Sequence, residues 1–562
     1  MASLYIIASV LSLISLYVLK YAYPRPYPGI PYNRVSARRL FGDIPDLLKA
    51  VKTTNDPAKF VFQQCRKLKS PVIQLFLKPF SNPVIFVDDV REVKDMLGMR
   101  TSEFDRAPST AAAFEPLSPH SRIVKPTNAE WRSQRRYWEG VMGRAFLSKV
   151  VAPKMYDCAL ELIELFKTKA AIADGRPFAC QDDFDIAAFD VIWASNMGSK
   201  LNALEAQRAG ILEAARSLAQ PTSKDSPAAL PIIPTPEIHR ATSYFIHSIE
   251  KTLKSYSPPL HHWLLRWLPQ YQRYWSLKND MINSRIEEVR AQFVELSDDE
   301  MRQRADTCVL DMGLRRERLG LGDGPDKMAI PSTQELHDEM FLFLIAGHET
   351  TAVTLAWSVK FLTQHPEKQG KLRQALINTF PRAADGVLPS IDDLLSKPIP
   401  YMDACIEEFV RLGNIHPRLV RIATVDTQVL GYPIPKGAQI LSSSYVGEKP
   451  IDVPEELRSQ MSQQSKDNFR SHWEEGMDDF FPERWIDEDG KYDPKRFPRL
   501  AFSAGPRVCY GQRLALQELF ITLSLLVLTF KFETVPDELN TMGGLQRVLR
   551  VPQKSYIRLS VL

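Results

Sequence analysis

Residues 502–511 read Phe-Ser-Ala-Gly-Pro-Arg-Val-Cys-Tyr-Gly, and a helical pattern of leucines follows directly. Gly505 and Gly511 carry no Cβ atom, so they let other backbone approach this loop closely. Cys509 stands at the N-terminus of the predicted helix, where free N–H groups and the helix dipole favour thiolate over thiol, against an ordinary pKa of about 8.5. Arg507 adds a positive charge nearby. A thiolate in this setting serves as a nucleophile or as a metal ligand.

A second unusual run lies in the middle of a long helical pattern over 334–364 and reads Ala346-Gly-His-Glu-Thr-Thr351. Phe343 and Thr350 share one helix face with the Ala-Gly pair, because they are spaced by three or four residues. A zinc HExxH site is excluded, since Ala352 stands where the second histidine would be. By itself the run indicates a helix with a tolerated glycine, capped or bent by its polar residues.

The loop at 502–511 resembles the haem-binding loop of the cytochrome P-450 superfamily, FxxGxRxCxG. Its fixed positions are matched by Phe502, Gly505, Arg507, Cys509 and Gly511. The resemblance implies haem b as the cofactor, with Cys509 as the axial thiolate ligand that pushes electron density from the iron toward oxygen. It also implies that Arg507 pairs with a haem propionate and that Phe502 and Gly505 lie against the cofactor.

The run in the long helix is similar to the AGxET oxygen-activation motif of the same family. There, the glycine and the threonine hydroxyl open a groove in the helix for oxygen and water, and an acid–alcohol pair relays protons to the iron-bound oxygen. The resemblance therefore gives Thr350 the hydroxyl role and Glu349 the acid role. His348 occupies a variable position of the motif, and we expect only that its hydrogen bonds are satisfied.

An ExxR sequence, Glu408 to Arg411, precedes a Pro-Glu-Arg-Trp run that contains Arg484 and Trp485. ExxR by itself indicates only an exposed ion pair worth about a few tenths of a kcal/mol. The family pairs ExxR with the arginine of a PERF-like run, which Arg484 matches. The resemblance implies a buried Glu–Arg–Arg network that is structural rather than catalytic, with Trp485 in place of the usual phenylalanine.

Three further side chains match the family's propionate donors. Trp131 and Arg135 fit WxxxR, so they present an indole N–H and a guanidinium on one face of a helix, one turn apart. Arg421 fits a third donor position that follows ExxR. A dianionic haem in an apolar cleft needs cationic partners, and the resemblance assigns that role to these residues together with Arg507.

The composition is that of a globular protein. The chain has 562 residues, of which 44% are hydrophobic and 25% charged, and this balance excludes a disordered or collagen-like chain. The length allows several domains or one large one. The 71 basic and 67 acidic residues give a net charge of +4, which argues against a nucleic-acid-binding protein. Six scattered cysteines without a CxxC pair exclude a zinc ribbon and a CxxCH haem attachment, and indicate a reducing compartment.

The N-terminus reads as a membrane anchor. Residues 1–19 carry no charged side chain and would rise about 28 Å as a helix, against about 30 Å of bilayer hydrocarbon. Residues 20–39 carry basic but no acidic side chains, which places that flank in the cytosol. We expect a membrane anchor helix over 1–23, a proline-rich hinge over 24–40 and a haem-thiolate catalytic domain over 41–562. The alternative, a cleaved signal peptide, lacks its basic start and its cleavage site.

Beyond residue 40 the periodicity predicts a mainly α fold with small β-sheets, which the resemblance specifies as the cytochrome P-450 fold. Helices are predicted at 128–147, 151–173, 278–296, 334–364, 366–379, 400–412 and 510–530. Short strands are predicted at 72–78, 83–87, 428–432 and 438–442. Residues 220–237 read as a loop, and residues 446–475 as a polar insertion.

Residues 257–268 concentrate two tryptophans and three leucines at helical spacing. Two readings are open for this segment. It is either an amphipathic helix whose apolar side chains face the core, or a patch that dips into the membrane beside the anchor.

These features predict a membrane-anchored haem-thiolate monooxygenase that hydroxylates, epoxidises or otherwise oxidises a hydrophobic small molecule with O₂. The segment after Cys509 is too short for a flavin domain. Electrons from NADPH are therefore expected through a separate NADPH–cytochrome P-450 reductase, with cytochrome b5 as a further partner. Arg132, Arg136 and Arg513 are candidates for the basic docking face. The resemblance also implies an endoplasmic reticulum membrane location with a single span and a cytosolic catalytic domain.

The motifs are most similar to those of fungal members that serve secondary metabolism. Phe104, Phe114, Ile345 and Leu419 predict an apolar substrate pocket. One alternative is a haem-thiolate isomerase or dehydratase that acts without a reductase, although such relatives usually lack the acid–threonine pair. The other is a non-catalytic haem-binding membrane protein, which the oxygen-activation motif disfavours.

Overall fold

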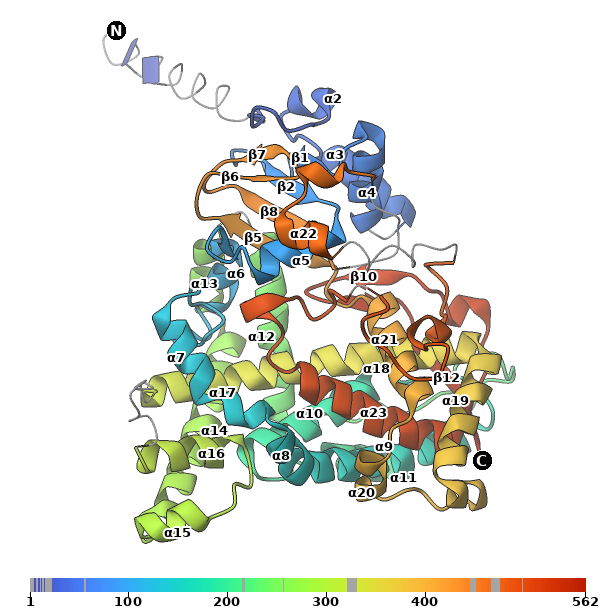
Figure 1. The fold of residues 1–562 in the computed structure, drawn as a ribbon. Helices are drawn as coiled ribbons and strands as arrows, with labels where there is room; N and C mark the ends of the chain where they lie inside the picture. Colours follow the sequence, from blue (N-terminus) through green and yellow to red (C-terminus); the bar gives the residue numbers. More distant parts are fainter. Residues whose placement is uncertain are drawn as a thin grey trace.

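Long helices form the interior of the molecule, and a sheet with its own small helices lies beside them (Figure 1). The computed structural model describes residues 5, 6, 9, 10, 12, 15, 23–54, 57–214, 218–255, 257–320, 331–444, 451–465, 476–497 and 499–562. The predicted anchor over 1–23 therefore lies outside the described residues apart from isolated positions. Only 451–465 of the predicted insertion is described, and it contains the short helix α22 (Gln460–Gln464).

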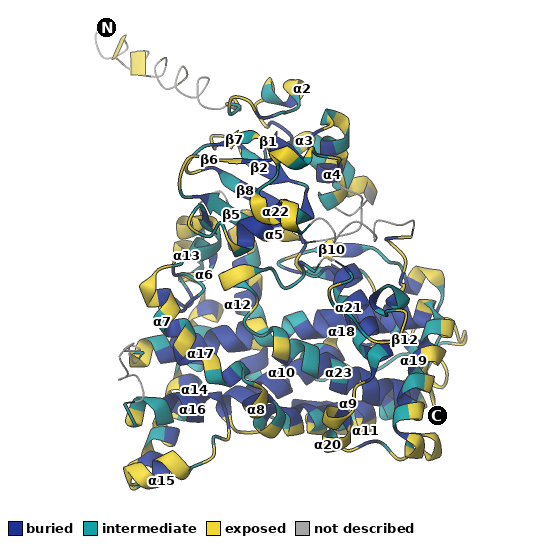
Figure 2. Ribbon diagram, in the orientation of Figure 1, coloured by how far each residue is buried: buried dark blue, intermediate teal, exposed yellow. Residues whose placement is uncertain are grey.

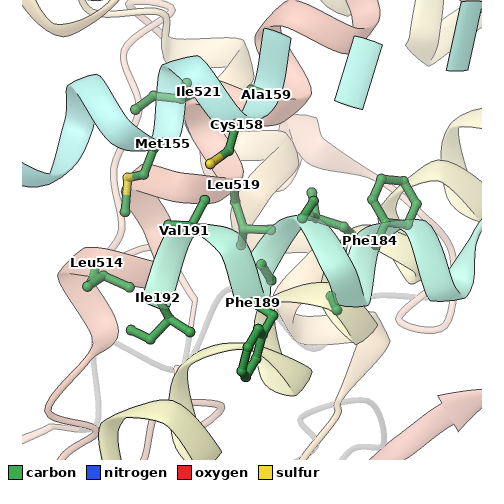
Figure 3. Close-up of a cluster of buried hydrophobic side chains, with 14 of the residues drawn as sticks. Met155, Cys158, Ala159, Phe184, Phe189, Val191, Ile192, Leu514, Leu519 and Ile521 are labelled. Carbon is green, nitrogen blue, oxygen red and sulfur yellow. The ribbon is translucent and has the colours of Figure 1, made fainter. Parts of the chain in front are cut away.

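Three core helices pack against one another, namely α9 (Ala152–Ala173), α10 (Gln181–Met197) and α23 (Gln512–Thr529). Their side chains interlock, as Met155 and Leu519 show in Figure 3. The helix α10 is buried on almost every side (Figure 2), so it carries no apolar stripe and its period does not stand out in the sequence. Each large apolar side chain fully buried here stabilises the fold by about 1.5–3 kcal/mol relative to exposure.

The helix predicted over 334–364 is confirmed, but it is broken at one residue. The structure has α17 (Thr333–Gly347) and α18 (Glu349–Gln364), which meet at His348 with φ −94° and ψ −59°. Ser332 begins α17 with a capping box that Glu335 completes. The combined span and α23 are the described helices long and apolar enough to cross a membrane. Both are mostly buried inside the fold, which makes them core helices.

The largest sheet has five strands in the order β1-β2-β8-β5-β3. The strands β2 and β8 pair in parallel, and the other neighbours are antiparallel. Three predicted strands are confirmed as β1, β2 and β8. The fourth, at 428–432, is instead a hairpin of β6 and β7, because Leu430 and Gly431 have positive φ angles and form a tight turn.

The strands have these bounds: β1 (Val72–Leu75), β2 (Val84–Val87), β3 (Phe104–Arg106), β4 (Phe178–Ala179), β5 (Arg418–Ala423), β6 (Thr427–Val429), β7 (Tyr432–Ile434), β8 (Gln439–Ser443), β9 (Phe530–Glu533), β10 (Gly544–Gln546), β11 (Arg550–Pro552) and β12 (Tyr556–Val561). The other helices are α2 (Arg34–Ala37), α3 (Ile44–Thr54), α4 (Pro57–Leu68), α5 (Val90–Gly98), α6 (Pro108–Phe114), α7 (Ala129–Tyr137), α8 (Arg144–Phe146), α11 (Ala203–Ala214), α12 (Glu237–Lys254), α13 (Pro258–Leu265), α14 (Pro269–Phe293), α15 (Asp298–Gln303), α16 (Val309–Arg318), α19 (Pro366–Thr379), α20 (Ile391–Ser396) and α21 (Pro400–Gly413).

The remaining helix predictions are confirmed with shifted ends. The helix predicted over 128–147 is divided, because the chain turns after α7 into a short 3-10 segment before α8. The helix predicted over 278–296 begins earlier, at Pro269 of α14. The loop predicted over 220–237 has neither helix nor strand until α12 begins at Glu237.

Candidate functional site

The loop before α23 holds Cys509 in a fixed position. The Cys509 N–H donates to the Phe502 carbonyl at 2.8 Å and closes the loop. Gly505 has φ +67°, and a Cβ atom there would lie 1.9 Å from the Leu97 carbonyl oxygen. Only glycine fits this position, because helix α5 packs against the loop where a side chain would stand.

Cys509 lines a cavity of about 390 Å³ that is also lined by the junction between α17 and α18. Ala346, Gly347 and Thr350 bring the oxygen-activation run to the same space as the cysteine. Most other lining side chains are apolar. Leu419 lines this cavity as predicted, whereas the other predicted pocket residues, Phe104, Phe114 and Ile345, pack elsewhere.

The sequence predicts a lowered pKa for Cys509, and the structure shows opposing effects on it. Burial raises the pKa of the Cys509 thiol, although the Gly511 N–H and the guanidinium groups of Arg122 and Arg135 favour the thiolate. The helix terminus and one nearby arginine therefore lower the pKa of Cys509 by less than desolvation raises it. A metal ion at the sulfur would reverse the balance, because a coordinating thiol is deprotonated.

Arg507 connects the loop to the segment before α7. Its guanidinium donates to the Lys125 carbonyl at 2.7 Å and to the Thr127 hydroxyl at 2.7 Å. It lies over the Trp131 ring, 4.0 Å from the centroid. Arg135 lies 5.6 Å from the same ring, so the predicted tryptophan–arginine pair shares one helix face at the cavity.

Arg421 lies in β5 next to the cavity, although it is not one of the lining residues. It pairs in register with Arg106 of β3, and its guanidinium donates to the Ser503 hydroxyl at 3.4 Å. The sequence reasoning missed Arg106, Arg122 and Arg418, which do line the cavity. Their separation in the sequence gave no motif. The pairing of β3 with β5 brings Arg106 close to the strand that carries Arg418, whereas Arg122 is held by Glu339 and the ring of Tyr510.

These arginines form a cationic cluster with too few anions. Burial and neighbouring guanidinium groups lower the pKa of Arg507 to about 9 and that of Arg106 to about 10. Burial also lowers the pKa of Arg421 to about 10. Asp105 is the carboxylate that opposes all three, and it already accepts hydrogen bonds from Thr127. Like charges held together in a buried site are stable only with an anionic partner.

Arg122 is enclosed between aromatic rings beside the cysteine. Its guanidinium lies 3.9 Å from the Tyr510 centroid and 4.8 Å from that of Phe343. The carboxylate of Glu339, fully buried in α17, pairs with it at 3.5 Å. Tyr510, which follows Cys509, therefore fixes a cation close to the sulfur.

Thr350 and Glu349 point in different directions from the helix junction. The Thr350 hydroxyl donates to the Ala346 carbonyl at 2.9 Å and lines the cavity. Glu349 is not among the residues that line the cavity. Burial, together with the Asp185 carboxylate, raises the pKa of Glu349 to about 7. The carboxyl therefore holds a proton at neutral pH that it can also release.

The predicted bystander His348 belongs to a buried polar cluster. Its Nδ1–H donates to the Leu344 carbonyl at 2.7 Å, and its Nε2 lies 3.9 Å from an Asp185 carboxylate oxygen. The second oxygen of Asp185 pairs with His239 at 2.8 Å, and His239 also bonds the Thr235 hydroxyl at 3.0 Å. The three potential ligand atoms lie within 4.8 Å of one another. These hydrogen bonds account for the cluster without a metal ion.

The buried Glu408 carboxylate binds two arginines in the core of the fold. Its oxygens accept from Arg411 at 2.7 and 2.9 Å and from Arg484 at 2.8 Å. Glu408 is 0% exposed, so the ExxR pair is buried as the resemblance implies. Trp485, the departure from the family pattern, donates its indole N–H to the same carboxylate at 2.9 Å. The substitution thus adds a hydrogen bond that phenylalanine lacks.

A sequence model of cytochrome P450 matches residues 41–449 and 470–558. The chain belongs to the cytochrome P450 family. It is 29% identical over 98% of each chain to cytochrome P450 monooxygenase TRI13 of Fusarium sporotrichioides. It is 31% identical to monooxygenase GME11363 of Pestalotiopsis microspora, over 99% of this chain and 98% of the relative.

The fold agrees with this membership. The crystal structure of the cytochrome P450DA haem domain superposes with a TM-score of 0.68 at 16% identity, over 96% of this chain and 98% of that one. The chain is therefore an oxidoreductase of the cytochrome P450 monooxygenase class, a family that carries haem iron with a thiolate ligand.

The residues of this P450 fit that cofactor. The cavity offers one cysteine sulfur, an apolar lining and a cluster of arginines that lacks counter-charge. The Nε of Arg106 is buried without a hydrogen-bond partner among the described residues. A flat apolar ring system that carries two carboxylates at one edge satisfies each of these features.

Proposed function

We propose that this P450 is a membrane-anchored haem-thiolate monooxygenase that hydroxylates, epoxidises or otherwise oxidises a hydrophobic small molecule. When bound, haem supplies the activation of O₂ and the transfer of one oxygen atom, with electrons that originate from NADPH. The observation that carries the proposal is the single cavity lined by both Cys509 and Thr350 and bordered by the arginine cluster.

The residues around the cavity have separate tasks. Cys509 would bind the iron through its sulfur, with Phe502 and Gly505 shaping the loop. Trp131, Arg135, Arg421 and Arg507 would hold the propionates. We add Arg106 to that group, because it lines the cavity and pairs in register with Arg421. Filling the cluster with two carboxylates removes the repulsion among the guanidinium groups, so cofactor binding also stabilises the fold.

Thr350 and Glu349 would move protons into the cavity. The Thr350 hydroxyl, which now donates to the Ala346 carbonyl, keeps its oxygen available as an acceptor on the cavity side. Glu349 has a pKa of about 7, which suits a group that accepts and gives a proton at neutral pH. Burial is the main cause of that raised pKa, and the negative charge of the Asp185 carboxylate adds to it, so Asp185 acts on the reaction through Glu349.

The cavity lining favours a substrate with a large apolar body. Ile192, Leu342, Phe343 and Leu419 line it together with the helix junction. Burial of apolar substrate surface contributes about 25 cal/mol per Å² to the free energy of binding. This contribution does not depend on the orientation of the substrate. The site therefore selects a hydrophobic molecule and excludes bulk water from the reacting centre.

Electrons would come from NADPH–cytochrome P450 reductase, with cytochrome b5 as a second donor. Arg132 and Arg136 of α7 and Arg513 at the start of α23 are exposed, and both helices border the cysteine loop. A basic surface close to the ligand loop fits an acidic reductase surface. Reversal of these charges should slow reduction and flatten its salt dependence.

The protein would be anchored in the endoplasmic reticulum membrane by residues 1–23, with the hinge at 24–40 and the catalytic domain at 41–562 in the cytosol. The segment 257–268, which contains α13, supports membrane contact at a second place. Trp263 and Trp267 are 55% and 67% exposed, together with Leu260 and Leu264. The core-facing reading of this segment is thus wrong, and an aromatic and leucine surface of this kind suits the membrane interface.

A role in fungal secondary metabolism is supported by the relatives. Relatives matched over nearly the full length include monooxygenases of Fusarium, Pestalotiopsis and Penicillium. A further relative, matched over 51% of this chain, is named for the Hps1-dma1 cluster of Dothistroma septosporum.

The test is reconstitution of the full-length holoprotein with reductase and NADPH in membranes. We expect a hydrophobic substrate to be oxygenated with label from ¹⁸O₂ and with strict NADPH dependence. Conversion of a peroxide without NADPH or reductase would replace this proposal with the isomerase function. Full haem loading without any turnover across a broad panel of hydrophobic metabolites would favour the non-catalytic role.

A further inference from the structure

The described part of the predicted insertion, residues 451–465, lies against helix α5. Its short helix α22 packs on α5 although the two helices are far apart in the sequence (Figure 1). None of these residues lines the cavity that contains Cys509. Their contacts with α5 therefore serve something other than direct contact with the cofactor or the substrate.

The strongest of these contacts is a buried ion pair at the start of α5. The two terminal nitrogens of Arg458 donate to the two carboxylate oxygens of Asp89 at 2.9 and 2.8 Å. The side chains are only 7% and 2% exposed. Burial alone would lower the pKa of Arg458, but the bonds to Asp89 raise it. Among the described residues, Arg458 is the cation that pairs with the Asp89 carboxylate.

Further polar contacts fix the position of the insertion along α5. Arg91 donates to both carboxylate oxygens of Glu455 at 2.9 Å, and its Nε donates to the Ser462 carbonyl of α22 at 3.0 Å. Glu92 is 1% exposed, and its carboxylate accepts from the Ser459 N–H at 3.3 Å. The insertion thus presents a cation to one position of α5 and an anion to another, so a shift of either element would separate both pairs.

The other end of α5 carries the haem-binding loop. Its last residues, Leu97 and Gly98, face Gly505 so closely that a Cβ atom there would lie 1.9 Å from the Leu97 carbonyl oxygen. Ala504 of the loop also packs against the apolar cluster that contains Leu97. Because no space separates the helix from the loop, a displacement of α5 has to displace the loop that ends at Cys509.

We propose that residues 451–465 hold the haem-binding loop in place through α5, with Arg458 and Glu455 as positioning residues for the Cys509 thiolate. The inference rests on the proposed haem-thiolate function. Neither residue touches the cofactor. Their effect on the sulfur is transmitted by the short rigid helix between the insertion and Gly505.

Loss of the Arg458 side chain leaves the Asp89 carboxylate charged and buried. A buried charge without a partner is unfavourable, so the start of α5 would move until water reaches the carboxylate. The far end of α5 then moves the loop. The Gly511 N–H and the nearby guanidinium groups, which favour the Cys509 thiolate against burial, would no longer be aligned with the sulfur. Protonation or displacement of the thiolate becomes easier.

The experiment follows the CO complex of the reduced full-length holoprotein in the absence of denaturant. In this complex, the strongly red-shifted Soret band reports the thiolate ligand. We expect Arg458→Met to convert this band to that of a neutral axial ligand at least about tenfold faster than the wild type, because a buried ion pair has lost one partner. The urea midpoint of each variant is measured beside the conversion rate.

Lys169→Met is the matched control. The Lys169 ammonium pairs with Asp183 at 2.5 Å between α9 and α10, and these side chains are 11% and 4% exposed. Its loss breaks an equally buried ion pair that does not contact α5. The urea midpoint of Lys169→Met should therefore fall as that of Arg458→Met does, while its red-shifted band should persist as in the wild type.

The proposal is overturned if Arg458→Met converts at the wild-type rate. It is also overturned if Lys169→Met converts as fast as Arg458→Met, since general destabilisation would then account for both. If Arg458→Met retains no haem, Asp89→Asn/Arg458→Met is compared with Asp183→Asn/Lys169→Met, and equal conversion rates in these two charge-neutral pairs overturn the proposal. A wild type without the red-shifted band would refute the haem-thiolate function itself, whereas a normal wild type with unchanged variants refutes only the role of the insertion.

Discussion

Replacing Glu408 with glutamine removes one charge from the buried network and nothing from its shape. The carboxylate of Glu408 receives N–H groups from Arg411, Arg484 and Trp485 at 2.7–2.9 Å. Glutamine keeps one acceptor oxygen and turns an NH₂ group toward the remaining donors. Loss of one partner of a buried ion pair costs about 3–5 kcal/mol, against a typical total stability of about 5–15 kcal/mol.

The assay is the haem-to-protein ratio of the purified Glu408→Gln variant, together with its urea midpoint followed by the Soret band. We expect poor haem loading and a much lower midpoint. Glu407→Gln is the matched control, because Glu407 is also buried on α21 and is bonded by the Tyr492 hydroxyl, but its cationic partner Arg499 is 31% exposed and can be hydrated when the carboxylate charge is lost. Equal midpoints for the two variants would refute the claim that the Glu408 charge holds the core.

Four further changes have definite outcomes. Thr350→Ala should keep the haem but divert NADPH electrons into peroxide, so tight coupling of NADPH to product would remove Thr350 from proton delivery. Asp185→Asn removes a negative charge that, together with burial, raises the pKa of Glu349, so this pKa should fall. The limb of the pH–rate profile that needs protonated Glu349 should then move to lower pH, and an unmoved limb would contradict this. Trp485→Phe should lose about 1.5–3 kcal/mol of unfolding free energy, because one hydrogen bond to a buried carboxylate disappears. Gly505→Ala should impair haem retention, since its Cβ would meet the Leu97 carbonyl at 1.9 Å; normal retention would mean that the loop can shift.

The sequence predicted the parts of the fold that carry a period or a fixed motif. The helix over 366–379 matches α19 residue for residue, because Pro366 and the polar pattern mark both ends. The helix α10 was missed, since burial on nearly all sides leaves no polar stripe to reveal its period. A bend at the Ala-Gly-His-Glu-Thr-Thr run was expected from its polar residues, but its exact place at His348 was not, and a side chain at the neighbouring Gly347 would meet Ile192.

In the candidate site, too, the residues in motifs were predicted and those outside motifs were not. Cys509, Thr350 and Arg507 stand in contiguous motifs, and the structure brings them to one cavity or its border. Arg106 and Arg122 stand in no motif, and only the pairing of β3 with β5 and the ring of Tyr510 show what they do. At Cys509 the helix end by itself does not lower the thiol pKa, because desolvation, which a sequence does not show, acts in the opposite direction.

The most direct test of the account is the CO-difference spectrum of the reduced full-length protein, measured beside Cys509→Ser. The account predicts the strongly red-shifted Soret band of a thiolate-bound haem in the wild type and its complete loss in the variant. A wild-type band typical of a neutral axial ligand, in a folded and haem-loaded sample, would contradict the assignment of Cys509 as the thiolate ligand.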